Sequence, residues 1–171
     1  YEGTPFDITK DAGAGVYCAP YRPSPLSWEH KGNTYFNERP ISTQQAAFTV
    51  VAQMRASLPN PIGGILWYGN DDPNMIAYTP IYCNSRHVPT CYDAKGANDH
   101  TFSWESAFWV CNWVANMIYP RYSQLYPEVK ALQVKLENQY AQDQPVIEQQ
   151  ALSLYQQGKQ EESIALLDGY G

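Results

Sequence analysis

The chain has 171 residues, of which 44% are hydrophobic, and this is enough apolar material for the core of one domain. Its formal net charge is -6 and its eleven basic residues are scattered, so no cationic stripe is present that could neutralise phosphates. The sequence also contains no run of about 18 apolar residues, the length that a membrane-spanning helix needs. We therefore expect neither a nucleic-acid partner nor a membrane span.

The first forty residues predict an irregular segment followed by a hairpin. Residues 1–25 are rich in Pro and Gly and show neither a helical nor a strand period, so we expect a loop that lies on the rest of the fold. The runs at 26–29 and 34–37 contain aromatic residues and flank a turn with Gly32, a pattern typical of a β-hairpin.

Residues 41–82 predict a three-stranded antiparallel meander with its strands in sequential order. Three apolar runs, at 46–55, 62–68 and 75–82, are rich in β-branched and aromatic residues and are separated by turns of Pro, Gly, Asn and Asp. Because strand side chains alternate between two faces, the first run has one wholly apolar face and one mixed face. The apolar face carries Phe48, Val50, Ala52 and Met54, and the mixed face carries Thr49, Val51, Gln53 and Arg55.

Residues 104–119 predict a helix that is apolar on nearly all sides. Ser103 is a good N-cap, Glu105 lies in the first turn, and Pro120 ends the run. A helix of this kind must be covered by other elements on most sides. We expect it to pack against the apolar face of the meander in a two-layer arrangement.

The remaining residues predict an amphipathic helical tail. Apolar side chains recur at helical spacing between positions 129 and 140, Pro145 begins a further helix, and Gly158 ends that helix. Residues 159–168 predict a last short helix. The final pair is similar to one tetratricopeptide hairpin, but a single unit cannot form a solenoid, so we expect a helical hairpin packed on its own domain.

Together these elements predict an α+β fold, in which an antiparallel β-meander is covered by helices and a helical tail follows. We divide the single unit, residues 1–171, into a loop and hairpin (1–40), the meander (41–82) and a helical region (103–170). The polar connection between the last two contains two of the cysteines.

Four cysteines stand at positions 18, 83, 91 and 111. A disulfide between Cys83 and Cys91 would close a short loop in an exported protein, and two free thiols are an equally good interpretation. Zinc bound by Cys83, His87 and Cys91 is a weaker alternative, because Pro89 interrupts the spacing and a structural site needs four ligands. We expect no metal and no cofactor.

The spacing of the reactive residues forms no self-sufficient catalytic arrangement. The sequence contains neither a Gly-x-Ser-x-Gly elbow nor a His-Glu-x-x-His motif. Asp71 and Asp72 are interpreted as turn caps rather than as a carboxylate pair, because the side chains of adjacent turn residues diverge.

Two arginines are the more informative charges. Arg39 lies between the hairpin and the first strand of the meander, and Arg55 lies on the mixed face of that strand; each offers a planar fork for a carboxylate or for carbonyl oxygens. An ion pair with Glu38 or Asp7 is the simpler role for either arginine.

The chain carries a series of short motifs: YEGTPFD at 1–7, PYR at 20–22, ERPISTQQ at 38–45, VAQMR at 51–55, GGILWYGNDD at 63–72, YTPIY at 78–82, SAFW at 106–109 and NMIYPRY at 116–122. In this order they cover nearly the whole chain and resemble the C-terminal portion of a peptidase family C69 dipeptidase. That family lies in the N-terminal nucleophile hydrolase superfamily. The resemblance therefore implies that the meander is part of an αββα sandwich.

The resemblance also implies thiol chemistry on a dipeptide substrate. In such enzymes a cysteine at a processed N-terminus attacks the amide, and its own α-amino group is the base. Cys18 stands where the family more usually has Gly, and Cys83, Cys91 and Cys111 are internal. The resemblance thus implies a missing upstream N-terminal portion that carries the nucleophile, and we expect these residues alone to be inactive.

The same resemblance gives three candidate site residues. Arg39 is the expected supporting residue, since an arginine in related hydrolases helps to hold the active-site cysteine region, and Gln44 and Asn70 are the expected substrate contacts. Two other functions stay open. One is a stand-alone peptide- or glycan-binding module with a groove lined by Trp28, Trp67 and Tyr78. The other is a structural helper domain of an exported protein.

Two expectations concern assembly and location. A sheet that lacks upstream strands exposes an edge, and exposed edges pair with other chains, so we expect a homo-oligomer. The cysteine pair and the lysine-poor, aromatic-rich composition favour an exported protein, periplasmic or secreted, while a cytoplasmic location stays open.

Overall fold

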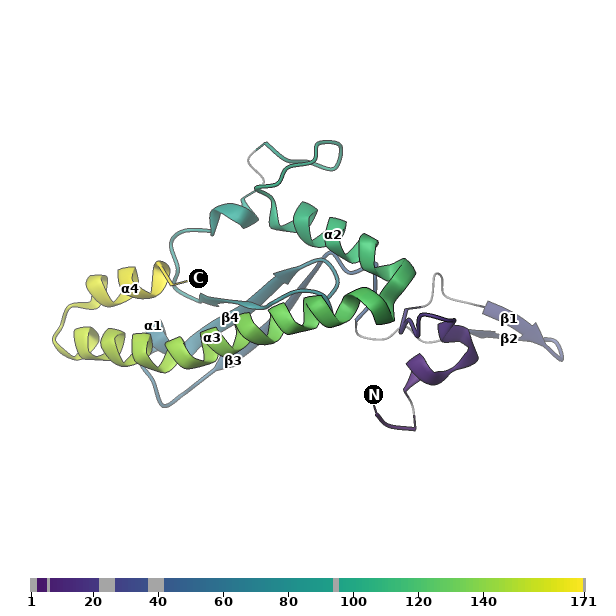
Figure 1. Ribbon diagram of the computed structural model, residues 1–171. Coiled ribbons are helices and arrows are strands. Elements are labelled where there is room, and N and C mark those ends of the chain that lie inside the picture. Colours follow the sequence, from purple (N-terminus) through teal and green to yellow (C-terminus); the bar gives the residue numbers. More distant parts are fainter. Residues whose placement is uncertain (1–2, 6, 22–26, 37–41, 94–95, 171) are drawn as a thin grey trace.

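The computed structural model describes residues 3–5, 7–21, 27–36, 42–93 and 96–170, and it confirms the α+β fold (Figure 1). A two-stranded and a three-stranded antiparallel sheet are accompanied by helices, the longest of which lies near the C-terminus. Single-turn helices η1 (Ile8–Lys10) and η2 (Ala12–Ala14) lie in the N-terminal segment, and η3 (Thr90–Tyr92) follows the larger sheet.

The smaller sheet is the predicted hairpin of β1 (Ser27–His30) and β2 (Asn33–Phe36). Its turn residues Lys31 and Gly32 both have positive φ, of 50° and 74°, as a two-residue turn between twisted strands requires. Trp28 and Tyr35 face each other with stacked rings, 5.9 Å between centroids. The strand residues are exposed, and the hairpin projects away from the rest of the molecule (Figure 1).

The larger sheet is the predicted meander, with β3 (Phe48–Met54), β4 (Gly64–Asn70) and β5 (Thr79–Tyr82) in sequential antiparallel order. The short helix α1 (Asn60–Gly63) links β3 to β4. The third strand is shorter than predicted, because Met75 and Ile76 belong to the preceding turn and lie in the core. The Met75 N–H donates to the Asp72 carbonyl at 2.9 Å, which fixes this turn.

Helix α2 (Ala107–Ile118) begins three residues later than predicted. Ser106, and not Ser103, is its N-terminal cap residue. The Ser103 hydroxyl oxygen instead accepts the Glu105 N–H at 3.2 Å, and such a local bond competes with helix formation. The single turn η4 (Tyr119–Arg121) then leads into the next helix.

One helix, α3 (Tyr122–Gln156), stands where the sequence predicted two, and the predicted break at Pro145 is wrong. A proline inside a helix removes one backbone hydrogen bond. Here the burial of Ala151 and the packing of Ile147 in the core offset that loss. Gly158, with φ of 78°, ends this helical region as predicted, and α4 (Gln160–Asp168) forms the predicted hairpin with α3.

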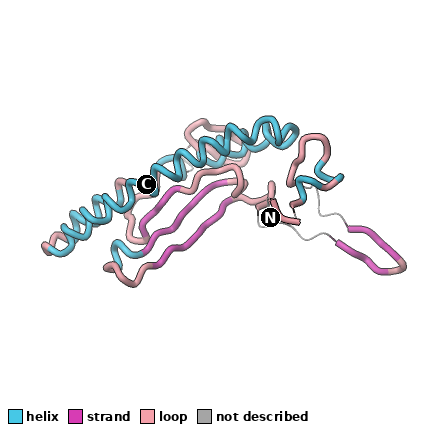
Figure 2. The backbone as a smooth tube through the Cα atoms, turned by 60° about the horizontal axis from the view of Figure 1, so that its bottom comes forward, coloured by secondary structure: helices cyan, strands magenta, loops and turns pink. Residues whose placement is uncertain are grey.

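Helices α3 and α4 cover the face of the sheet opposite to the apolar row of β3, whereas Tyr92 of η3 packs against Tyr68 on the face of that row. Ile65 and Tyr82 are directly paired and lie in a core cluster with residues of α3 and α4, and they are 0% and 1% exposed. The apolar row of β3 lies on the other face, where Phe48 is 60% and Met54 is 75% exposed. Figure 2 shows α3 lying along one side of the sheet. The alternation was predicted correctly, but the choice of the buried face was wrong.

A partly buried ion pair joins the sheet to α3. The two terminal guanidinium nitrogens of Arg55 donate to the two carboxylate oxygens of Glu148, at 2.7 and 2.6 Å. The Tyr82 hydroxyl donates to the same carboxylate at 2.7 Å. The partner lies 93 residues further along the chain and is not Asp7, while Glu38, the other predicted partner, lies outside the described residues.

Candidate functional site

The turn that follows β4 gathers buried polar side chains. β4 ends at Asn70, and Asp71 then adopts a φ of 71°, which aspartate tolerates better than most residues. Asp71 and Asp72 are only 2% and 0% exposed. Buried carboxyl groups need hydrogen-bond partners, and separate segments of the chain supply them here.

Asp72 is a fully paired turn cap, as the sequence predicts. Its Oδ1 accepts from the Ser42 hydroxyl at 2.8 Å and from the Asn74 N–H at 3.0 Å. Its Oδ2 accepts from the Tyr119 hydroxyl at 3.0 Å. Asp72 thus fixes the turn, the loop at 42–47 and the end of α2 relative to one another.

Asp71 points towards α2 and is only partly paired. Its Oδ1 accepts from Asn112 Nδ2 at 2.9 Å, whereas its Oδ2 is buried and has no hydrogen-bond partner among the described residues. Burial raises the pKa of Asp71, and the hydrogen bond from Asn112 offsets only part of that effect. The Asp71 N–H donates to the Ala47 carbonyl at 2.9 Å, so the loop at 42–47 lies directly against the turn.

Side chains from α3 close the turn from one side. Asn74 donates to the Tyr122 hydroxyl at 2.8 Å and accepts from the Tyr126 hydroxyl at 3.0 Å. Gln133 donates to the Asn74 carbonyl at 3.0 Å. Burial raises the pKa values of Tyr119 and Tyr122 far above the usual range, so both hydroxyls stay protonated at neutral pH.

The fold brings two of the three candidate site residues to this end of the sheet. Asn70 is the last residue of β4, and its Nδ2 donates to the Tyr68 hydroxyl at 3.1 Å. Gln44 is half-buried in the loop that Asp71 and Asp72 hold in place. Arg39 lies outside the described residues. The roles assigned to all three stay predictions.

All four cysteines are free thiols in the structure, so the Cys83–Cys91 disulfide is not formed there. The Cys83 side chain lies over Gly64 at the end of the sheet, and Cys91 lies in η3. Cys111 is half-buried, and burial, with a smaller effect of the nearby Asp71, raises its pKa to about 11. A thiol with this pKa is almost wholly protonated at neutral pH and is a poor nucleophile.

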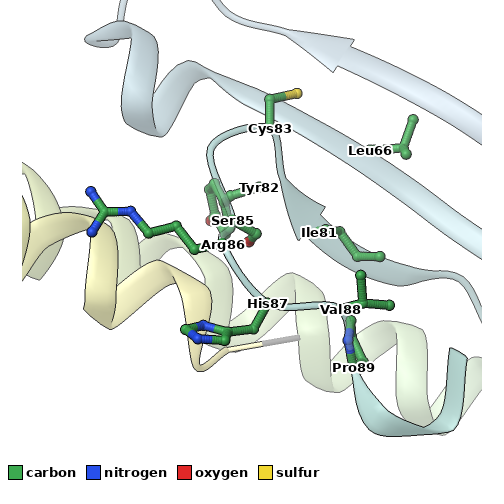
Figure 3. Close-up of a pocket in the computed structure, with 9 residues that line it drawn as sticks. All are labelled: Leu66, Ile81, Tyr82, Cys83, Ser85, Arg86, His87, Val88 and Pro89. Carbon is green, nitrogen blue, oxygen red and sulfur yellow. The ribbon is translucent and has the colours of Figure 1, made fainter. Parts of the chain in front are cut away.

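An open, mostly apolar pocket of about 390 Å³ lies beside β5 and the loop that follows it (Figure 3). At one side His87 Nδ1 is hydrogen-bonded to Asp168 of α4. The backbone N–H groups of Arg86 and His87 donate to the other Asp168 oxygen at 2.9 and 3.2 Å. The pocket is lined by Leu66, Ile81, Tyr82, Cys83, Ser85, Arg86, His87, Val88 and Pro89.

The His87–Asp168 pair has the form of the base and orienting acid of a nucleophilic triad, but in the part of the chain that the structure describes no Ser or Cys side chain is hydrogen-bonded to His87. Figure 3 shows Cys83 well away from His87, with its sulfur directed away from the imidazole. The His87 side chain is also 82% exposed. The hydrogen bond from His87 lowers the pKa of Asp168, which stays ionised, so the pair ties the loop to α4.

Neither a metal centre nor a membrane span emerges from the part of the chain that the structure describes. There, no three His, Cys, Asp or Glu side chains converge as a metal site requires, and Cys83, His87 and Cys91 form no such group. None of the helices described is both long and apolar enough to cross a membrane.

The structure does not assemble the aromatic groove that a peptide- or glycan-binding module would need. Trp28 lies on the projecting hairpin, apart from the larger sheet (Figure 1). The Trp67 indole N–H donates to Gln53 Oε1 at 3.0 Å, so this donor is already hydrogen-bonded within the sheet. Trp28, Trp67 and Tyr78 therefore do not line one surface.

Sequence reasoning missed the partners that hold the two aspartates. Asn112 and Tyr119 belong to a segment that was interpreted only by its apolar character. A signal was available, because Asn112 and Asn116 are the polar exceptions in this apolar helix, and a buried amide requires a partner.

The fold and the site define an α+β protein in which helices cover one face of an antiparallel sheet and buried polar groups fix the turn after the middle strand. The family model described as Peptidase family C69 matches residues 1–135, and the chain belongs to this family of N-terminal nucleophile hydrolases. The match includes both sheets and α2 and ends inside α3. No curated protein matches the chain.

Proposed function

We propose that this chain is part of a cysteine-nucleophile peptidase that hydrolyses dipeptides. The observation that carries the proposal is the family match over residues 1–135, which makes the protein a peptidase. Dipeptide selectivity is the finer part of the proposal. It is supported by the end of β4, where secondary structure and buried hydrogen bonds hold the side chains in fixed positions. Contact residues held in this way can select a substrate by its length.

The attacking thiol in this proposal is not one of the four cysteines described above. Cys111 is held protonated by burial, and among the described residues no hydrogen bond joins a His or Lys side chain to any of the four thiols. An N-terminal cysteine, with its own α-amino group as the base, would come from another part of the polypeptide. The 171 residues alone are then inactive.

Asn70 and Gln44 are the proposed substrate contacts. A dipeptide carries an ammonium group at one end and a carboxylate at the other, so selectivity requires acceptors and donors at a fixed separation. Side-chain amides offer both kinds of group. The bond between Ser42 and Asp72, at 2.8 Å, supports a fixed relation between the loop that carries Gln44 and the strand end that carries Asn70.

The substrate class is tested on the enzyme that contains this chain. We expect cleavage of Ala-Ala, with little cleavage of Ala-Ala-Ala or of the N-acetylated dipeptide, because each lacks one of the two charged ends at the required separation. Equal rates on the dipeptide and the tripeptide would contradict dipeptide selectivity while leaving the peptidase activity intact.

The contacts are tested by substitution. Asn70→Ala is expected to raise the KM for the dipeptide about tenfold to a hundredfold, the effect of one lost hydrogen bond to a charged group. Asn138→Ala, at an exposed position of α3, is the matched control. Arg39→Ala is expected to lower kcat without changing the unfolding temperature. An unchanged KM in Asn70→Ala would exclude Asn70 as a substrate contact. An unchanged kcat in Arg39→Ala would exclude Arg39 as the supporting residue.

A further inference from the structure

The side-chain amide of Asn70 is held in one orientation. Asn70 and Tyr68 are two residues apart in β4, so both side chains lie on the same face of the sheet. Asn70 Nδ2 donates to the Tyr68 hydroxyl oxygen at 3.1 Å. A side-chain amide has a donor at one end and an acceptor at the other, so Oδ1 is directed away from that hydroxyl. The orientation of the amide therefore depends on Tyr68.

Tyr68 is itself fixed by its neighbours on that face. Its ring is stacked with that of Phe48 on the adjacent strand, with centroids 6.3 Å apart and an angle of 18° between the ring planes. Tyr92 meets it edge to face at 4.8 Å. The Tyr92 hydroxyl donates to Thr79 Oγ1 at 2.8 Å, and Thr79 is the direct partner of Tyr68 in β5. Aromatic contacts of this kind hold a ring in place, so the hydroxyl that accepts from Asn70 has a defined position.

The turn after β4 places a negative charge close to Asn70 in the chain. Asp72 accepts hydrogen bonds on both of its oxygens, from Ser42, Asn74 and Tyr119. A carboxyl group that only accepts is in its ionised form, because the protonated form also donates. This charge is buried, so salt screens it little, and it favours a cation over an anion at the end of β4.

The two ends of a dipeptide require opposite partners. An ammonium group only donates hydrogen bonds, and a carboxylate only accepts them. At Asn70, the donor end of the amide is already bonded to Tyr68, whereas the acceptor end is directed away from it. Both this orientation and the charge of Asp72 match the ammonium end.

We propose that Asn70 Oδ1 accepts a hydrogen bond from the α-ammonium group of the dipeptide, and that Tyr68 is the positioning residue that holds this oxygen towards the substrate. This role rests on the proposed function, in which Asn70 is a substrate contact, and it adds which end of the substrate Asn70 recognises. The substrate carboxylate is then bound by donors other than Asn70.

The end that Asn70 recognises is tested with Asn70→Asp in the enzyme that contains this chain. Aspartate keeps the acceptor, and its charge strengthens a hydrogen bond from ammonium, so the KM for Ala-Ala is expected to stay within about threefold of the wild-type value. The Tyr68 hydroxyl can reverse its role and donate to the second oxygen. If Asn70 instead bound the substrate carboxylate, like charges would meet. A KM that rises as far as in Asn70→Ala, or further, would overturn the assignment.

The positioning role is tested with Tyr68→Phe, which removes only the hydroxyl. The KM for Ala-Ala is expected to rise about twofold to tenfold, the effect of one neutral hydrogen bond, with kcat unchanged. In the Asn70→Ala background the same change should have no further effect, because Tyr68 acts through Asn70. Tyr170→Phe removes a hydroxyl that donates to the Tyr140 carbonyl at 3.2 Å, and this matched control should leave the KM unchanged. An equal rise in both backgrounds, or no rise in the wild-type background, would overturn this role.

Thermal unfolding shows whether each variant is folded, and the outcomes are separate from those that test dipeptide selectivity. Equal wild-type rates on Ala-Ala and Ala-Ala-Ala would contradict that selectivity alone, since both substrates carry the ammonium group, and the Asn70 variants would still decide which end Asn70 binds. An enzyme that is selective for dipeptides, but loses as much affinity in Asn70→Asp as in Asn70→Ala, would keep the proposed function and overturn the ammonium contact.

Discussion

Glu148 and Asp71 are both buried, but folding shifts the pKa values of their carboxyl groups in opposite directions. Burial alone would raise the pKa of Glu148, but hydrogen bonds from Arg55, Tyr82 and Gln144 outweigh it and lower the pKa. Among the residues that the structure describes, Asp71 has an amide donor on one oxygen and no hydrogen-bond partner on the other, and burial dominates, so its pKa is raised. The stability that depends on these two groups therefore responds to pH in opposite directions.

Asp71→Asn is expected to stabilise the fold at pH 7 by about 1 kcal/mol, because a buried oxygen without a partner is costly when its group is charged. The pKa of Asp71 is higher in the folded than in the unfolded chain, so wild-type stability is lost as the pH rises above the ordinary value of 3.8. Urea unfolding should show a gain that grows between pH 4 and pH 7. Asp99→Asn, with a side chain 82% exposed, should show none.

Glu148→Gln is expected to destabilise the fold at pH 7 by about 2–4 kcal/mol, because it leaves the Arg55 charge without its partner. The pKa of Glu148 is lowered by folding, so its contribution is present above the ordinary value of 4.5 and is lost as the pH falls through the folded value. Chemical denaturation of both proteins should therefore converge in acid. Glu128→Gln, on the exposed surface of α3, is the control. A difference that does not shrink as the pH falls below 4.5 would contradict the assignment.

At the level of elements, local pattern predicted the strands and their order but not which face is buried. Alternation shows that Phe48 and Met54 share a face, yet helices α3 and α4 lie on the face of Ile65. That choice depends on long-range contacts such as the one between Arg55 and Glu148, which no local pattern encodes. The helix start predicted at Pro145 was wrong for the same reason, because tertiary packing can override a local helix breaker and α3 continues through this residue.

The turn between α3 and α4 depends on the backbone of one glycine. Gly158 has φ of 78° and no atom within 4 Å of an added Cβ, so a side chain there costs conformational strain alone. Gly158→Ala is expected to lower the free energy of unfolding by roughly 1–2 kcal/mol. Gly169→Ala, where φ is -90°, should have little effect. Equal losses in thermal unfolding would contradict this reading of the turn.

For the molecule as a whole, the sequence predicted the location of the candidate site better than its construction. The composition of the turn after β4 and the motif around Asn70 are local, and the structure places Gln44 and Asn70 at the same end of the sheet. The groups that hold that turn, Asn112 and Tyr119, come from a helix about forty residues further along. Only folding brings them together.

Helix α3 starts inside the family segment and finishes beyond it, and this has a practical consequence. A version of the polypeptide trimmed at residue 135 would be cut through the middle of α3. It would lose the carboxylate that neutralises Arg55, together with Ala151 and Leu167, which shield Ile65 from solvent. The last 36 residues are thus an integral part of the folded body, and expression designs should retain them.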